Sequence, residues 1–371
     1  MDVVIGVDAH KATHTFVGVD SVGRKLAEIT VAATTDGHLE ALSWARDTFR
    51  GDLVWGVEDC RNLSTRLEND LLHAGQHVVR VPPQLMARTR ASARTRGKSD
   101  PIDALAVARA VLREPDLPVA SHDDTSRELK LLVDRREHLV QYRRATMNRL
   151  MWRVHELDPP HASKRMRLDH ELPRQALRSW LATQPGLLAE LAYDELTDIA
   201  RLTDEIDALE RRIAVRVRAA APSLLTLFGC AELTAAKLIG ETAGVHRFRS
   251  EAAYARHAGL APIPHTSGGS QVRLRGSRCG NRQLNAALFR IAFTQLRGGS
   301  GADYYRRRRD AGDTHAKALR CLERKIVRKV YTHLRTDEAN RHQSQPAPWH
   351  FEELERLNDQ WSRALATLGD R

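Results

Sequence analysis

The first 115 residues alternate short apolar runs with amphipathic segments, in an order that few folds accommodate. Five runs rich in β-branched residues are predicted to be strands. They lie at residues 3–8, 15–19, 26–32, 53–58 and 77–81. Helical periodicity follows the third, fourth and fifth runs. The predicted order is therefore three strands, a helix, a strand, a helix, a strand and a final helix that begins near residue 100.

This order resembles that of an RNase H-like α/β domain. In that arrangement the first and fourth strands lie side by side, so residues at their carboxyl ends face one crevice. Asp8 ends the first run and Glu58 ends the fourth. The last helix can bring Asp100 and Asp103 to the same edge. We therefore predict an α/β domain over residues 1–115 in which four carboxylates from three segments come together.

Carboxylates in such a group are suited to hold divalent metal ions. Mg²⁺ prefers oxygen ligands, and two ions can hold the attacking and leaving oxygens of a phosphodiester. We expect Mg²⁺, with Mn²⁺ as the alternative, on Asp8, Glu58, Asp100 and Asp103. Each acid also has a purely structural explanation. Asp100 precedes Pro101 and suits a helix N-cap, and Asp103 would then complete a capping box, which is compatible with metal binding.

The charge of the chain predicts an anionic partner. Its 371 residues carry a net charge of +11, which is typical of proteins that bind nucleic acid. No apolar run approaches the roughly 20 residues of a membrane span, and the N-terminus lacks the pattern of a signal peptide. The four cysteines are dispersed, which argues against a zinc site or a disulfide framework. We expect a cytoplasmic protein without a membrane partner.

The middle segment, residues 116–222, is predicted to be helical. An arginine-rich helix covers about residues 126–157, and a second helix lies near residues 174–182. Six apolar residues then repeat at steps of three or four: Ile199, Leu202, Ile206, Leu209, Ile213 and Val217. This seam indicates a helical hairpin or coiled coil. It is either an internal helix pair or an arm for self-association or nucleic-acid binding, and we favour the arm.

The third segment, residues 223–335, carries two candidate phosphate-binding features. Residues 224–238 resemble a helix-hairpin-helix element, although Glu232 stands where a second glycine is often found. A Gly/Ser-rich turn contains Ser267 and Ser270. It is followed closely by four arginines: Arg273, Arg275, Arg278 and Arg282. A hydroxyl flanked by guanidinium groups can attack phosphorus, whereas the simpler explanation is an ordinary turn.

The end of the chain is strongly basic. Two tyrosines precede a run of four arginines, which is a pattern suited to nucleic acid. The arginines are Arg306, Arg307, Arg308 and Arg309. A basic helix is expected at residues 315–334, in a mostly α-helical domain. The tail, residues 336–371, is expected to form a loop at 336–349 and a last amphipathic helix at 350–366.

Several motifs together resemble the DEDD-type transposases of bacterial insertion sequences, whose best-understood members are bridge-RNA-guided recombinases. The N-terminal motifs are VDAHK around Asp8, VED around Glu58, and KSDPIDALAVAR around Asp100 and Asp103. The C-terminal motifs are AGLAPIPHTSGGS and RGSRCGNRQLNAALFRIA. Each motif alone is weak, and their order over nearly the whole chain makes the resemblance specific.

The resemblance implies a DNA transposase or recombinase that cuts and rejoins strands through a serine–DNA intermediate. It implies a RuvC-like N-terminal domain that binds metal, a coiled-coil middle and a small C-terminal transposase domain. By its position in the SGG motif the nucleophile is Ser267, with Ser270 and Ser277 as alternatives. The implied partners are double-stranded donor and target DNA, a structured guide RNA and further copies of the chain, as a dimer or tetramer in the bacterial cytoplasm.

Three other functions fit part of the pattern. A RuvC-like Holliday-junction endonuclease would need the four acids but no serine. A non-catalytic nucleic-acid-binding protein would need only the basic surface. An ATPase of the actin or sugar-kinase type would need a glycine-rich phosphate hairpin after the first strand, where this chain has Ala9, His10 and Lys11.

Overall fold

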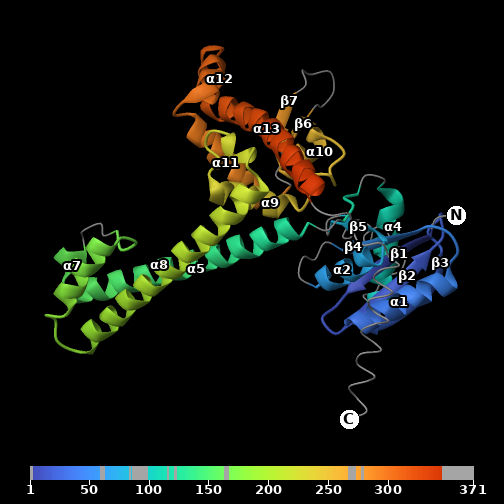
Figure 1. The fold of residues 1–371 in the computed structure, drawn as a ribbon, viewed down its shortest axis with the longest axis horizontal. Helices are drawn as coiled ribbons and strands as arrows, with labels where there is room; N and C mark the ends of the chain where they lie inside the picture. The colour runs from blue at the N-terminus through green and yellow to red at the C-terminus, as the bar shows by residue number, and fades with distance from the viewer. Residues whose placement is uncertain are drawn as a thin grey trace, which may run out of the picture.

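A computed structural model shows an N-terminal α/β domain, a long two-helix arm and a helical C-terminal domain (Figure 1). It describes residues 3–58, 63–82, 85, 99–114, 117–120, 123–162, 167–265, 273–276 and 280–344.

The N-terminal domain contains a mixed five-stranded sheet. The strands are β1 (Val3–Ala9), β2 (Thr13–Val19), β3 (Lys25–Ala32), β4 (Leu53–Glu58) and β5 (His77–Val81). Their order is β3-β2-β1-β4-β5, with β1 antiparallel to β2 and parallel to β4. All five predicted strands are present, and the predicted pairing of the first with the fourth strand is confirmed.

Helices cover both faces of this sheet. On one face α1 (Thr35–Thr48) and α2 (Thr65–His73) pack on Ile5, Val7 and Trp55. On the other face α4 (Asp100–Arg113) packs on Val4 and Val17. Because side chains alternate along a strand, the even-numbered positions of β1 face α4.

Two glycines let α4 lie directly on the sheet. Gly6 of β1 and Gly56 of β4 are register partners. A Cβ atom added at Gly6 would lie 2.1 Å from the carbonyl oxygen of Ala104, and one at Gly56 would lie 2.5 Å from a methyl carbon of Val111. No larger residue fits either position without moving the helix.

The arm is an antiparallel hairpin of two 34-residue helices, α5 (Asp124–Leu157) and α8 (Leu187–Ala220). Two short helices, α6 (Pro159–Ala162) and α7 (Glu171–Leu181), lie at its tip. The repeating apolar residues of α8, from Ile199 to Val217, are buried within the chain. This confirms the predicted hairpin and shows that the seam is used internally, so self-association of the arm remains a prediction.

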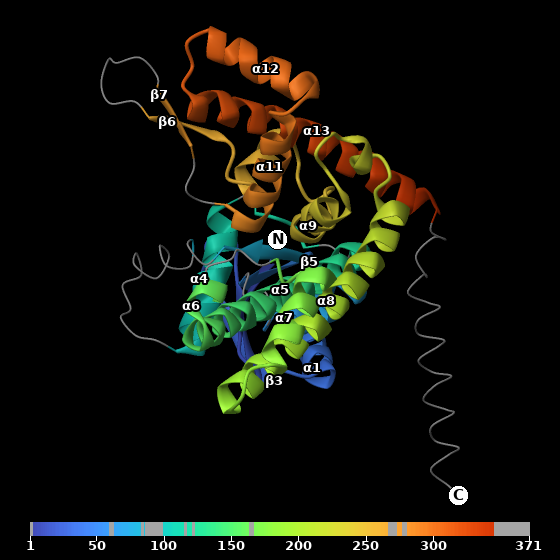
Figure 2. The ribbon, with the colours of Figure 1, turned by 90° about the vertical axis from the view of Figure 1, so that its left-hand side faces the viewer.

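The C-terminal domain packs its helices around one core. Its elements are the 3₁₀-helix η1 (Leu224–Thr226), α9 (Glu232–Thr242), α10 (Glu251–His257), β6 (Pro262–His265), β7 (Arg273–Gly276), α11 (Arg282–Gln295), α12 (Gly299–Asp310) and α13 (His315–Ser344). Leu129 of α5 and Val217 of α8 belong to the same core, so the base of the arm is built into this domain. The antiparallel hairpin β6–β7, which projects from the domain in Figure 2, was not expected from the sequence.

Residues 336–344 are helical, so the prediction of a loop is wrong for these residues, and residues 345–349 lie outside the described part of the chain. The predicted domain boundary after residue 335 stays a prediction. Asp337, Glu338 and Arg341 of α13 make internal contacts. Asp337 is 1% exposed and accepts the backbone N–H groups of Ser223 and Leu224, each at 3.0 Å. The predicted helix at 350–366 lies outside the described residues.

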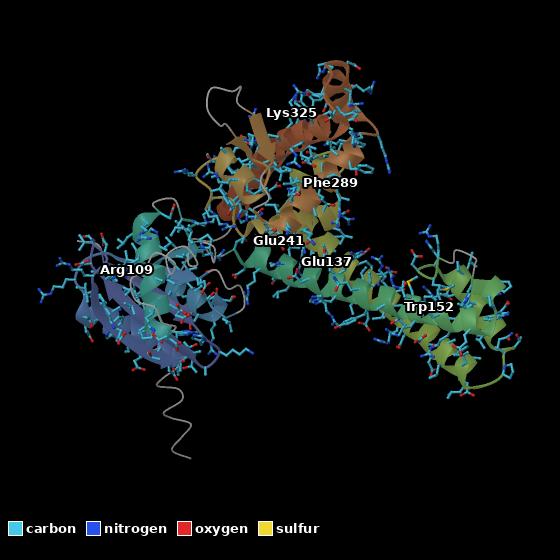
Figure 3. The ribbon with its side chains drawn as sticks, turned by 180° about the vertical axis from the view of Figure 1, so that it is seen from behind. Arg109, Glu137, Trp152, Glu241, Phe289 and Lys325 are labelled. Atoms are coloured by element: carbon cyan, nitrogen blue, oxygen red, sulfur yellow. The ribbon has the colours of Figure 1, made fainter. Side chains whose placement is uncertain are left out.

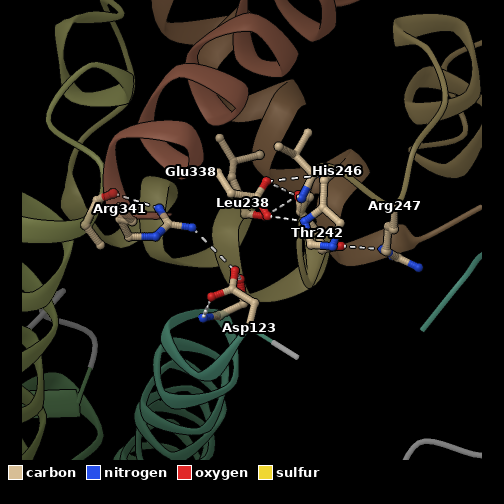
Figure 4. Close-up of polar contacts among 10 residues, drawn as sticks. Asp123, Leu238, Thr242, His246, Arg247, Glu338 and Arg341 are labelled. Atoms are coloured by element: carbon tan, nitrogen blue, oxygen red, sulfur yellow. Dashed lines mark hydrogen bonds and ion pairs between the residues drawn. The ribbon is translucent and has the colours of Figure 1, made fainter. Parts of the chain in front are cut away.

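A polar cluster holds the end of α13 against α5 and the turn after α9 (Figure 4). Glu338 lies 2.5 Å from Nδ1 of His246 and accepts the Val245 N–H. Arg341 donates to the carbonyl of Ala220 and reaches Asp123, the N-cap of α5. The hydrogen bond to Glu338 raises the pKa of His246. Burial acts to raise the pKa of Glu338, but the bond and charge of His246 hold it below its usual range.

This pair predicts a pH-dependent contribution to stability. The raised pKa of His246 means that its contribution is complete below the ordinary value of 6.5 and is lost as pH rises through the folded-state pKa. The lowered pKa of Glu338 means that its contribution is complete above 4.5. We expect the difference in unfolding free energy between wild type and His246→Gln to be largest between these values and to shrink at higher pH. Urea unfolding across this pH range measures it, and a difference that grows with pH contradicts the assignment.

The close approach of α4 predicts that Gly6→Ala destabilises the protein. The added Cβ meets helix backbone, which cannot rotate away, so we expect a loss of about 3 kcal/mol. A control, Gly298→Ala, places its Cβ in open space and should change stability by less than about 0.5 kcal/mol. Urea unfolding compares the two, and equal stabilities would show that α4 does not rest on Gly6.

Candidate metal centre

The carboxyl ends of β1 and β4 carry Asp8 and Glu58 on the face that α4 covers. Val4, Gly6 and Asp8 alternate onto this face, and Gly6 pairs with Gly56, so Glu58 occupies the matching position beside Asp8. Asp8 is buried, with 7% of its surface exposed, and Glu58 is half-buried. The structure therefore brings the ends of these two strands together as predicted.

The first turn of α4 supplies the other two acids. The N–H groups of Ile102 and Asp103 both donate to the carbonyl of Ser99, which makes Ser99 the N-cap. The predicted N-cap, Asp100, is instead the first helical residue, so the predicted capping box with Asp103 is wrong. Asp103 is buried at 5% exposure, whereas the side chain of Asp100 is 51% exposed and faces the end of β1.

His10 is a site residue that the sequence reasoning did not identify. Its Nε2 lies 3.1 Å from Oδ2 of Asp8 and 3.4 Å from Oδ1 of Asp100. One ligand atom from each of these three side chains lies within 4.8 Å of the others. The available signal was the spacing of two between Asp8 and His10, which places both side chains on one side of an extended chain.

The electrostatics of the centre favour a bound cation. Burial raises the pKa of Asp8, and the negative charges of Asp103 and Asp100 act in the same direction, against the opposing effect of His10. Carboxylates held this close repel one another unless a cation lies between them. Their oxygen atoms, with the imidazole nitrogen, form a donor set that suits Mg²⁺ or Mn²⁺. The described residues therefore fit a divalent metal ion.

The predicted serines cannot be placed. Ser267, Ser270, Ser277 and Arg278 lie outside the described residues. Arg273 and Arg275 lie on β7, and Arg282 begins α11.

The basic run Arg306–Arg309 lies at the end of α12, which Figure 1 places on the side of the C-terminal domain away from the sheet. Arg308 forms an ion pair with Asp313, and Arg306 forms one with Asp303 at 3.1 Å. Two of the four arginines therefore form ion pairs within the chain. The run does not lie near the acids of the candidate metal centre.

The helix-hairpin-helix resemblance holds only in part. A turn with a left-handed glycine, Gly229, precedes α9, but the first helix is reduced to the three residues of η1. Glu232 lies in the first turn of α9 and accepts from Arg218 at 2.7 Å. A backbone hydrogen bond and Arg218 hold the pKa of Glu232 below its usual range. The carboxylate of Glu232 therefore already offsets the partial positive charge at the N-terminus of α9.

Two transposase family models match the chain. A model of DEDD transposases of the IS110 type matches residues 5–156, and a model described as "Transposase IS116/IS110/IS902 family" matches residues 221–306. The first match contains the four acids and His10, and the second contains the predicted serine segment. The chain belongs to this family of insertion-element transposases.

Relatives of this family match the chain over most of its length. An uncharacterized 44.8 kDa protein of insertion element IS116 from Streptomyces clavuligerus is 25% identical, covering 89% of this chain and 94% of the relative. An uncharacterized 42 kDa protein of IS900 from Mycobacterium paratuberculosis is 26% identical, covering 89% and 95%. A putative transposase for IS117 from Streptomyces coelicolor is 25% identical, covering 91% and 94%.

Among solved structures, RuvC from T. thermophilus, in complex with a Holliday junction substrate, aligns with 30% of this chain and 96% of its own length. The TM-score is 0.24 and the identity is 17%. Within the described part of the transposase, no helix is both long and apolar enough to cross a membrane.

The raised pKa of Asp8 predicts that Asp8→Asn stabilises the metal-free transposase at neutral pH. As pH rises from 3.8 through the raised pKa of folded Asp8, the carboxyl group ionises less readily in the folded chain than in the unfolded chain, which lowers the free energy of unfolding. Asparagine carries no charge and removes this cost. We expect a gain of about 1 kcal/mol.

Thermal unfolding in EDTA and then in excess MgCl₂ measures this effect. Wild type should gain stability from Mg²⁺ and the Asp8→Asn variant should not. The control Asp36→Asn removes an exposed acid from the first turn of α1 and should leave the Mg²⁺ response intact. An equal Mg²⁺ response in wild type and Asp8→Asn would contradict a metal site at Asp8.

Proposed function

We propose that this transposase cuts and rejoins DNA strands at a metal centre formed by Asp8, Glu58, Asp100 and Asp103, with Ser267 as the nucleophile. The observation that carries the proposal is the convergence of Asp8 and Asp100 on His10, beside the buried Asp103, at the carboxyl edge of the sheet. Exposed acidic groups occur without metal, but here Asp8 and Asp103 are buried, and burial, together with the charges of Asp103 and Asp100, raises the pKa of Asp8.

The acids would hold one or two divalent ions, with Mg²⁺ expected and Mn²⁺ as the alternative. A bound ion stabilises the negative charge that develops on the phosphate oxygens during strand cleavage. The protein's own contribution is to hold the carboxylates in place. Asp8 and Asp103 are fixed by burial against β1 and α4, while Asp100 and His10 remain half-exposed, where a phosphate can reach them.

In the proposed chemistry the hydroxyl oxygen of Ser267 attacks phosphorus and loses its proton. The bond between phosphorus and one sugar oxygen breaks, and that oxygen leaves as a hydroxyl after gaining a proton. The DNA strand is then joined to the serine by a phosphodiester, which conserves the bond energy for rejoining. The arginines that flank the serine would stabilise charge on the phosphate oxygens.

The proposed partners are donor and target DNA, a guide RNA and further copies of the chain. The net charge of +11 and the projecting arm support nucleic-acid binding and assembly. The guide RNA and the dimer or tetramer rest on the family resemblance. RNA that co-purifies with the protein can be sequenced, and the absence of a discrete species would remove the guide RNA from the proposal while leaving DNA transposition in place.

The proposal predicts separate losses for the acids and the serine. Asp100→Asn should lower strand cleavage and strand joining by at least about a thousandfold, because it removes a proposed metal ligand. Asp36→Asn, which also removes an acid from the first turn of a helix, is the matched control and should retain activity. Activity is measured on a labelled duplex in the presence of Mg²⁺.

Ser267→Ala should abolish the covalent protein–DNA adduct that a denaturing gel detects. The variants Ser270→Ala and Ser277→Ala should still form it. A Ser267→Ala protein that recombines donor and target normally would exclude the serine step and favour a junction endonuclease that uses the acids alone. An Asp100→Asn protein with full activity would exclude the metal centre as well.

A further inference from the structure

We propose that two adjoining clefts on the C-terminal domain bind an unpaired stretch of nucleic acid, one cleft taking a base and the other its phosphates. This inference rests on the proposed function, since it assumes a nucleic-acid partner. It assigns a surface that neither the acids nor the predicted serine segment includes.

The first cleft is aromatic. Three phenylalanine side chains line it although all are exposed: Phe228 at 56%, Phe289 at 43% and Phe293 at 48%. The rings of Phe289 and Phe293 are stacked, with centroids 6.0 Å apart and planes 20° apart. The cleft has a volume of about 770 Å³ and is also lined by Arg290. Exposed aromatic side chains gathered in one place mark a binding surface.

The second cleft is cationic and shares a wall with the first. It has a volume of about 540 Å³ and is lined by Arg328, Lys329 and His333. Both linings include Thr226, Leu227 and Phe228, so the turn before α9 separates the two clefts. Among the residues described in the two linings there is no aspartate or glutamate.

This charge pattern is not general for the protein. The cleft of about 480 Å³ between α2, α5 and α9 is lined by acids as well as bases, including Glu68, Asp134 and Glu241. The pair of clefts around Phe228 differs from that cleft in having only cationic charge in its lining. A cleft of about 690 Å³ lined by Arg247, Arg256 and Arg324 also has no acid among its described lining residues, but its phenylalanine, Phe248, is buried. The exposed, stacked phenylalanines therefore distinguish the pair around Phe228.

Phe228 is held firmly although it is exposed. The side chain of Gln295 donates to the backbone carbonyl of Phe228 at 2.7 Å. The next residue, Gly229, has a φ of +88°, and an added Cβ would lie 3.1 Å from the carbonyl oxygen of Ile291. The turn thus rests on α11, which fixes the backbone of Phe228 between the two clefts.

A nucleotide carries a flat base, which suits the aromatic cleft, and a phosphate, which suits the cationic cleft. A flat base can stack on an aromatic ring, and the phosphates on either side need cations. The faces of the bases are covered in a duplex, so the phenylalanines favour unpaired bases. A second copy of the chain is a poorer partner, because a symmetric contact would place Arg290 and Lys329 against an equally cationic surface.

Figure 3 shows Phe289 on the side of the C-terminal domain that faces away from the N-terminal domain. The clefts are therefore separate from the acids. Their role would be to position a strand, without contact with the metal centre.

The test measures binding of a single-stranded oligonucleotide of about 12 nucleotides with a central 2-aminopurine, in EDTA so that no cleavage occurs. Stacking quenches 2-aminopurine fluorescence, and anisotropy of an end label gives the affinity. We expect Phe289→Leu to bind about tenfold more weakly and to lose quenching, with an unchanged salt dependence. Phe289→Trp should retain both properties.

The cationic cleft is tested by salt. Lys329→Gln should lower the slope of log affinity against log salt by about 0.7, which is the value for one single-strand phosphate contact, and should leave quenching in place. The control Leu39→Ala alters an apolar residue of α1, in the N-terminal domain, that is 57% exposed and should change neither readout. Binding to a duplex of the same length should not depend on Phe289.

Three results would overturn the inference: unchanged quenching in Phe289→Leu, an equal loss of duplex binding, or sedimentation showing that the wild type self-associates and Phe289→Leu does not. Strand cleavage is measured separately, on a duplex in the presence of Mg²⁺, which separates this inference from the proposed function. Binding without strand cleavage by the wild type would reject the metal chemistry alone. Cleavage with no dependence on Phe289 would reject the clefts alone.

Discussion

The packing of α4 on Gly6 and Gly56 is the contact on which the candidate site depends. The two glycines are register partners on parallel strands, and the helix backbone lies where any side chain at Gly6 would be. Because the helix is fixed at this depth, its first turn reaches the carboxyl edge of the sheet. Asp100 then lies across from His10, the residue that follows the last residue of β1. A change in helix depth would separate the acids before it exposed the core.

The same contact creates an electrostatic cost. It buries Asp8 and Asp103 near each other and near Asp100, and the pKa of Asp8 is raised as a result. The partial positive charge at the N-terminus of α4 offsets part of this repulsion. His10 offsets another part through its contacts with Asp8 and Asp100. An arrangement that is costly alone and relieved by a cation is what a metal centre requires.

The sequence predicted the sheet well because periodicity and strand-end acids are local signals. Residues 53–58 and 77–81 form strands with the predicted bounds. The features that the sequence did not predict depend on tertiary contacts. The polar residues at 336–341 suggest a loop until Asp337 and Glu338 are seen to accept backbone N–H groups of distant segments. The hairpin β6–β7 was missed because its strands are short and β6 contains two prolines. The role of His10 becomes visible only in the fold, where α4 places Asp100 beside it.

The arm and the C-terminal domain are coupled through one buried carboxylate. Glu241 of α9, labelled in Figure 3, accepts from Lys130 of α5 at 2.7 Å and from Asn281 at 2.6 Å. Burial acts to lower the pKa of Lys130, but Glu241 raises it above its usual value, so the pair stays charged. Asn281 is the N-cap of α11 and the second described residue after the predicted serine segment. Reorientation of the arm must break the contact between Lys130 and Glu241 or move the Glu241 side chain. The N-terminus of α11 is hydrogen-bonded to the same side chain through Asn281.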